Sequence, residues 1–240
     1  MRLFQVNSAK SFRTDDNFTS IADGIRLRRG IYADLQKAVS YAIAVHVPIF
    51  GMALIPVFRT NWPLVMLPAQ IAFLELIIDP ACSIVFEAEG TDPGIMDQKP
   101  RSINEKILTR RILGASFAQG LGVLASVLLI YFWALSSDKS DDQIRTISFA
   151  TLMLGNIALI LVNRSRHLSI YQTFKQRTNK TIKWVLSGAI GMLALLINVP
   201  ILREAFHLSS LDGPEWLLVF IAGFGSILWF EIYKVRKNHD

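Results

Sequence analysis

The sequence is poor in charged residues and contains a single cysteine. Asp, Glu, Lys and Arg make up 18% of its 240 residues, whereas soluble domains average about 25%. The lone Cys82 excludes an internal disulfide and gives no sign of a cysteine-based metal cluster. Charges are missing in blocks of roughly 20 apolar residues, a length that crosses a bilayer core about 30 Å thick. This pattern excludes an ordinary soluble enzyme, a disordered tail and a disulfide-rich secreted module.

Six apolar blocks predict an all-α, polytopic membrane protein with six transmembrane helices. A polar turn at 59–63 joins the first two blocks into a helical hairpin, and Asp212-Gly213-Pro214 precedes the last block. The predicted spans are about 38–58, 64–86, 112–135, 147–162, 182–202 and 216–233, so that the membrane domain covers 38–240.

The segment before the first span is predicted to continue it as one long helix. Residues on a single helical stripe recur at alternating four- and three-residue spacing. They are Ile21, Ile25, Tyr32, Leu35, Val39, Ala42 and His46, with no proline before Pro48. We therefore expect residues 15–37 to form a cytoplasmic stalk that transmits movement into the membrane. A short surface helix followed by a separate span is the alternative.

Lys and Arg are distributed unequally among the connections. Of the 25 Lys and Arg residues, 21 lie before the first span, between the second and third spans, between the fourth and fifth spans, or after the last span. The other connections hold only Arg59, Lys139, Arg145 and Arg203. Because basic loops stay in the cytoplasm, an even number of spans places both termini there. The net charge of +6 is therefore a topology signal; the expected partner is the lipid bilayer, and nucleic acid is not expected.

Two carboxylates lie in the middle of the second predicted span. Glu75 and Asp79 are four residues apart, so a helix places them on one face. A carboxylate at the bilayer centre costs about 2.5–3.5 kcal/mol even on mild insertion scales. Two of them repel unless a proton or cation lies between them, and hard oxygen ligands suit a metal cation. The alternative is a pair of protonated packing residues.

Prolines lie next to these polar groups. Pro80 directly follows Asp79 and is expected to break the helix, and Pro48 is expected to interrupt the first span two residues after His46. Interrupted helices beside acidic groups build the ion sites of transporters. Since the hairpin places His46 at the depth of the carboxylates, we predict a cation site of His46, Glu75 and Asp79. A hydrogen-bonded core histidine is the alternative for His46.

Other polar and small residues of the spans have simpler expected roles. Glu87 and Glu89, at the cytoplasmic end of the second span, suit either an ion entrance or an ordinary interfacial position. Small residues at four-residue intervals predict a face for close helix contact; they are Gly114, Ala118 and Gly122. Three amides within the spans are expected to form interhelical hydrogen bonds; they are Gln119, Asn156 and Asn198. For Asn156, a place in the lining of the cation site is the alternative.

Two motifs resemble the C-terminal part of cation-transporting P-type ATPases. They are Asp15-Asp16-Asn17-Phe18-Thr19-Ser20-Ile21, with the later Gly30-Ile31-Tyr32, and Ile95-Met96-Asp97-Gln98-Lys99-Pro100-Arg101. In that family a DDNF-type stretch leads from the phosphorylation domain into the fifth membrane helix. A helix pair with the ion ligands follows, then a loop reading D-x-M-x-x-x-P-R and four more helices. The resemblance runs from about Asp15 to the end, and residues 1–14 are an unmatched N-terminal segment.

The resemblance implies a ligand role for the polar membrane residues. Asp79 matches the family's aspartate in the sixth helix, and Glu75 and His46 stand where calcium pumps have asparagine ligands. Ile49 and Ile78 stand where those pumps have a glutamate and a threonine ligand. The resemblance therefore implies a transported cation held by Glu75, Asp79 and His46, whose identity stays open.

The sequence lacks the family's catalytic motifs DKTGT, TGES and GDGxND. Because the aspartyl-phosphate intermediate needs the first of these, no ATPase activity and no cofactor are expected of this chain alone. The resemblance implies the membrane, ion-binding part of a truncated or split pump in a bacterial plasma membrane, with a separate chain carrying the phosphorylation and nucleotide-binding domains. A non-catalytic membrane scaffold or subunit, an ATP-independent cation transporter and a non-functional remnant are the alternatives.

Overall fold

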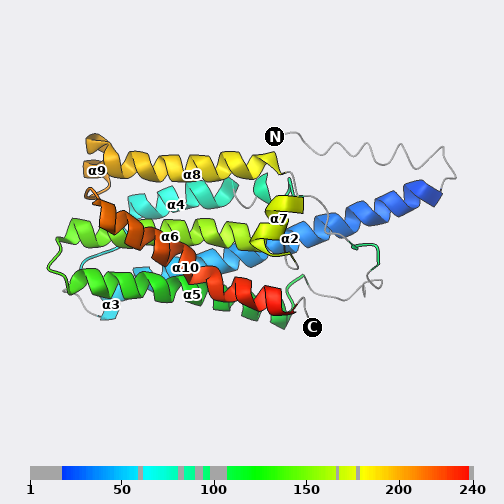
Figure 1. Cartoon of the computed structure of the whole chain (residues 1–240), viewed down its shortest axis with the longest axis horizontal. Helices are drawn as coiled ribbons and strands as arrows, with labels where there is room; N and C mark the ends of the chain where they lie inside the picture. Colours follow the sequence, from blue (N-terminus) through cyan, green and yellow to red (C-terminus); the bar gives the residue numbers. More distant parts are fainter. Residues whose placement is uncertain are drawn as a thin grey trace.

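The computed structural model describes residues 18–58, 62–80, 84–89, 94–97, 107–165, 168–176 and 179–237. Within these ranges the chain is all-helical and has no β-strand, as the sequence predicts. Figure 1 shows a bundle of helices lying side by side, with one helix extending well beyond it. Residues 1–14 and the first part of the predicted stalk lie outside the described residues. The helices are α2 (Phe18–Ala53), α3 (Ile55–Phe58), α4 (Pro68–Pro80), α5 (Arg110–Leu135), α6 (Asp141–Asn163), α7 (Ile170–Gln176), α8 (Lys180–Asn198), α9 (Pro200–Ala205) and α10 (Gly213–Lys237).

Four of the six predicted spans coincide with helices that are long and apolar enough to cross a bilayer. These are α5, α6, α8 and α10, which match the predicted third to sixth spans. Helix α6 begins upstream of the predicted residue 147, because the Ser140 hydroxyl accepts from the Gln143 amide and the Gln143 side chain returns the contact. The first two spans stay predictions.

Helix α4 covers only part of the second predicted span. The described helix runs for 13 residues and includes Pro80, which corresponds to about 20 Å of helix. Residues 84–89 form a short π-helical turn and further turns. The expected break at Pro80 stays a prediction, because residues 81–83 lie outside the described residues. The predicted start at residue 64 is too early, since residues 62–67 are not helical.

A single helix, α2, covers the predicted stalk from Phe18 and most of the first predicted span. It is 36 residues long and continues through Pro48 to Ala53, so the predicted interruption at Pro48 is wrong. Membrane helices tolerate proline where a neighbouring helix packs against the freed carbonyl. Here α5 does so: a Cβ placed on Gly120 would lie 2.5 Å from the Ala44 oxygen. Residues 59–61 of the predicted hairpin turn lie outside the described residues.

Helix α6 forms the centre of the bundle. Its most apolar stretch is 94% buried, against 28% for the corresponding stretches of α5, α8 and α10. Ile147, Phe149, Leu152 and Leu154 are fully enclosed by the surrounding helices. A helix that is apolar on every side is covered either by protein or by lipid, and α6 is covered by protein. The continuous apolar run that predicted the fourth span is thus buried within the protein. The helices α5, α8 and α10 have partly exposed faces, and these faces are available to lipid.

Small residues bring α5 close to two neighbours. A Cβ on Gly120 would meet α2 at Ala44, and a Cβ on Gly122 would lie 2.7 Å from the Trp229 indole nitrogen in α10. The predicted contact face is therefore right at Gly122. It is wrong at Gly114, around which nothing lies within 4 Å, and the tightest α2 contact belongs to Gly120.

Candidate cation site and its supporting contacts

Two of the three predicted ligands meet in the structure. His46 of α2 and Glu75 of α4 approach each other, with 3.5 Å between the His46 Nε2 and the Glu75 Oε1. Asp79 follows on α4 one helical turn after Glu75, and its side chain lies outside the described residues. The hairpin of α2 and α4 thus brings the imidazole and the first carboxylate together.

Hydrogen bonding fixes which imidazole nitrogen faces the carboxylate. The His46 Nδ1 lies 2.7 Å from the Ala42 carbonyl oxygen. Since a carbonyl oxygen only accepts, Nδ1 carries the proton and donates it there. The other ring nitrogen, Nε2, is the one that lies near the Glu75 carboxylate. A nitrogen and an oxygen at this spacing both reach one cation at metal–ligand distances of about 2.0–2.5 Å.

The His46–Glu75 pair lies at the surface of the bundle. Both side chains are close to 40% exposed, and apolar neighbours such as Phe50 and Leu76 are also exposed. Among the described residues, no group of three His, Cys, Asp or Glu side chains is placed to hold a metal ion. The site as described therefore consists of two donors on one open face of the α2–α4 hairpin.

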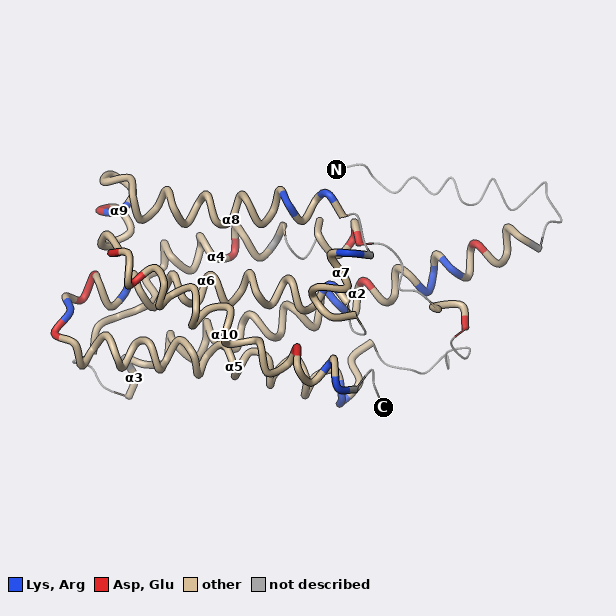
Figure 2. The backbone as a smooth tube through the Cα atoms, viewed as in Figure 1, with Lys and Arg blue, Asp and Glu red and all other residues tan. Residues whose placement is uncertain are grey.

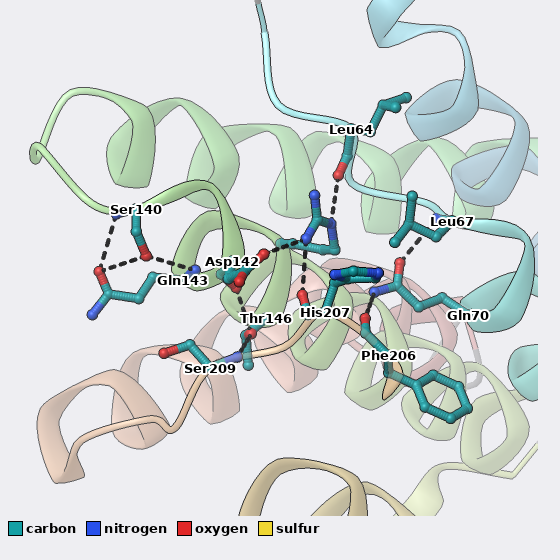
Figure 3. Close-up of polar contacts among 11 residues, drawn as sticks. Leu64, Leu67, Gln70, Ser140, Asp142, Gln143, Thr146, Phe206, His207 and Ser209 are labelled. Atoms are coloured by element: carbon teal, nitrogen blue, oxygen red, sulfur yellow. Dashed lines mark hydrogen bonds and ion pairs between the residues drawn. The ribbon is translucent and has the colours of Figure 1, made fainter. Parts of the chain in front are cut away.

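Figure 3 shows the polar contacts near the start of α4, among them those around Leu64, Asp142 and His207. Arg145 of α6 donates from Nε to the Leu64 carbonyl (2.8 Å), and its Nη1 donates to Asp142 (2.6 Å) and to the His207 carbonyl (2.8 Å). Its side chain is 10% exposed. One guanidinium thus joins α6 to the segment that enters α4 and to the segment between α9 and α10.

The start of α4 is held by Gln70. Its side-chain oxygen accepts from the Leu67 amide (3.0 Å), while its side-chain nitrogen donates to the Phe206 carbonyl (3.0 Å). The side chain is fully buried. Sequence reasoning counted Arg145 only as a basic residue of the outer side and passed over Gln70. The available signal was the position of Gln70 as a single polar residue within an apolar run; Arg145 stands in a polar stretch and gave no such signal.

At the other end, α2 carries the segment that contains the second motif. The Arg29 guanidinium donates to the Ile95 carbonyl (2.7 Å), and Gln36 donates to the Ile107 carbonyl (2.7 Å). Residues 98–101 of the motif lie outside the described residues. The part of the motif that is described therefore docks on the predicted stalk rather than on the membrane bundle.

Glu89 is buried in an ion pair. Its side chain is fully enclosed and pairs with Arg164 at the end of α6, with 2.9 Å between Arg164 Nε and Glu89 Oε2. Glu87, in contrast, is exposed. The ion-entrance interpretation is therefore wrong for Glu89, because this carboxylate is closed off by a partner 75 residues away. Its interfacial depth stays a prediction.

Comparison with known proteins gives one consistent result. The family model described as "Cation transporting ATPase, C-terminus" matches residues 63–236. A calcium-transporting ATPase of Listeria monocytogenes is 26% identical over 97% of this chain and 26% of its own length. A calcium-transporting ATPase of Bacillus subtilis is 26% identical over 85% of this chain and 23% of its own. A cation-transporting ATPase of Synechocystis is 25% identical over 89% of this chain and 24% of its own length. The chain spans about a quarter of the length of these relatives.

Proposed function

Because this chain belongs to the cation-transporting ATPase family, as its C-terminal membrane part, we propose that it is the ion-binding membrane part of a P-type cation pump. The observation that carries the proposal is the meeting of His46 and Glu75 across the α2–α4 hairpin. Family membership favours this function over a membrane scaffold and over an ATP-independent transporter.

The proposed cation ligands are His46, Glu75 and Asp79. Glu75 already faces the imidazole, and Asp79, four residues later on the same helix, is on the same face. Two ionised carboxylates balance the charge of a divalent cation. Two of the relatives described above are named calcium-transporting, but an imidazole ligand suits transition metals better than Ca²⁺. The choice between Ca²⁺ and a transition metal is therefore left to the binding measurement.

The proposed coupling element is α2. This helix carries His46 and also the stalk residues Arg29 and Gln36, so a displacement of the stalk moves one ligand relative to Glu75 on α4. A 36-residue helix is about 54 Å long. A domain acting on the stalk end would thereby change the affinity of the site and the side from which it is reached.

The proposed partner is a separate chain that carries the phosphorylation and nucleotide-binding domains. Apolar side chains lie exposed along the stalk part of α2, among them Ile21, Ile25 and Ile31. In the membrane, the half-exposed Glu75 would be costly against lipid, which favours a covering of polar-lined helices supplied by that partner. Large exposed apolar surfaces that alternate with polar residues mark contact sites.

The proposed location is a bacterial plasma membrane with both termini in the cytoplasm. Of the 25 Lys and Arg residues, 21 belong to the four segments assigned to the cytoplasmic side. Figure 2 shows the described charged residues gathered at the two ends of the bundle and along the projecting part of α2. The middle of the bundle is nearly free of them, as a bilayer interior requires.

Cation binding to the purified chain in lipid nanodiscs tests the proposal. We expect saturable binding of at least one of Ca²⁺, Mn²⁺ and Zn²⁺ by equilibrium dialysis, and about tenfold weaker binding or worse in Glu75→Gln, since a charged ligand is lost. His46→Ala and Asp79→Asn should weaken it as well. Glu204→Gln, which removes an exposed carboxylate in α9, is the control and should bind normally. Absence of binding, or binding that survives all three site variants, would contradict the proposal.

A further inference from the structure

A buried ion pair fixes residues 84–89, which follow α4 closely in the sequence. Glu89 accepts two hydrogen bonds from the Arg164 guanidinium, Nε to Oε2 at 2.9 Å and Nη2 to Oε1 at 3.2 Å. The two side chains are 0% and 1% exposed, respectively. Such a two-point contact between planar groups fixes orientation as well as distance.

Asn179 completes a network of three side chains. Its side-chain nitrogen donates to Glu89 Oε2 (3.0 Å) and to the Val85 carbonyl (3.2 Å). Its side-chain oxygen caps the first turn of α8 by accepting from the amides of Thr181 and Ile182. Arg164 is itself the residue that ends α6. One carboxylate therefore joins the end of α6 and the start of α8 to residues 84–89.

The segment 84–89 depends on these contacts for its position. Its own backbone contributes hydrogen bonds from Ala88 to Ile84 (3.1 Å) and from Glu89 to Phe86 (3.4 Å). The buried Phe86 ring also packs on Tyr41 of α2, with 5.5 Å between ring centroids. The segment is thus held between α2 and the ends of α6 and α8, close in sequence to the last turn of α4.

We propose that Arg164, Glu89 and Asn179 are positioning residues for the cation site. By holding residues 84–89, they set where the end of α4 lies and therefore where Glu75 meets His46. That His46 and Glu75 bind a cation rests on the proposed function, whereas their placement by this network does not. The network lies outside the ligand set, so its role is to fix the geometry of the ligands rather than to bind the ion.

A cross-linking experiment measures this geometry without any cation. Cysteines replace His46 and Glu75 in the full chain, in a Cys82→Ser background, and a short bifunctional thiol reagent reports how often the two positions meet. The test variant adds Glu89→Met and Arg164→Met together, because replacing both charges by apolar side chains leaves no unpaired buried charge and is compatible with folding. We expect the cross-linking rate to fall by about fivefold or more.

A matched control breaks an ion pair at the opposite end of the bundle. Lys139 and Glu215 lie 2.6 Å apart and are mostly buried, and Glu215→Gln should leave the cross-linking rate unchanged. In the single variant Glu89→Gln, the buried Arg164 charge loses its carboxylate, so the cross-linking rate should also fall below that of the control. Hydrogen exchange of the backbone amides in 84–89 should accelerate in both Glu89 variants and not in Glu215→Gln.

The possible outcomes distinguish a role in positioning His46 and Glu75 from a role in packing residues 84–89 alone and from ion binding. An unchanged cross-linking rate in the double variant overturns the proposal, even if exchange in 84–89 accelerates, because the network would then support only its own segment. An equal fall of the cross-linking rate in Glu215→Gln also overturns the proposal, because the loss of any ion pair would then be enough to lower the rate. No cation enters this measurement, so failure of the proposed function in the binding experiment leaves the result standing, and the reverse also holds.

Discussion

At the scale of single residues, the contacts that fix the bundle are polar and far apart in sequence. Arg145 reaches the entry to α4 and the segment after α9, and Arg164 reaches Glu89 across 75 positions. Sequence patterns predict which residues share a face of one helix, as for Glu75 and Asp79, because the helical repeat is local. They do not pair residues from different helices. The His46–Glu75 contact was predictable only because a short turn joins their two helices.

Arg145 provides a test of stability at this scale. Arg145→Met removes hydrogen bonds to two backbone carbonyls and to Asp142 in a largely buried place. Hydrogen bonds of a charged donor contribute roughly 1.5–3 kcal/mol, and the buried carbonyls lose their donor. We expect a thermal unfolding midpoint several degrees below wild type in detergent. Arg111→Gln, at an exposed position, is the matched control; equal midpoints for both variants would show that the Arg145 contacts are not stabilising.

At the scale of helices, apolar length predicted most of the described fold. The third to sixth predicted spans coincide with helices α5, α6, α8 and α10. Pro48 was misjudged because the effect of a proline depends on what packs against the freed carbonyl, which is a property of the neighbouring helix. The same holds for the small residues of α5: their spacing marks a face, but only the fold decides that Gly120 and not Gly114 lies against a neighbour.

Alanine substitutions in α5 test this difference directly. Gly120→Ala places a methyl group 2.5 Å from the Ala44 backbone oxygen, so α2 and α5 must separate. Overpacking of this kind costs about 1–3 kcal/mol. Gly114→Ala meets nothing within 4 Å and gains helix propensity, so it should be neutral or slightly stabilising. Thermal unfolding of the two variants under identical conditions decides the matter, and a Gly120→Ala midpoint at or above that of Gly114→Ala would contradict the close contact.

At the scale of the whole molecule, the bundle and the stalk have different environments. The bundle is surrounded by apolar side chains and has its charges at the ends, whereas the projecting part of α2 carries Arg26, Arg28 and Arg29 beside exposed apolar residues. The family match covers residues 63–236 and so begins after α2. In the proposed pump the stalk connects the bundle to the partner's domains, so the stiffness of α2 decides whether a movement of those domains reaches the cation site.

The stiffness of α2 can be measured in this chain as it stands. Spin labels at Ser20 and Leu35, both exposed, lie 15 residues apart, which corresponds to about 23 Å in an unbroken helix. We expect a narrow distance distribution that Ile31→Ala preserves and Ile31→Pro broadens, because proline removes one helical hydrogen bond and clashes with the preceding turn. Cation binding should be equal in the two variants, since His46 and Glu75 lie beyond the break. A broad distribution in the unsubstituted helix would mean that α2 bends freely. A stalk that bends freely cannot transmit a domain movement to His46.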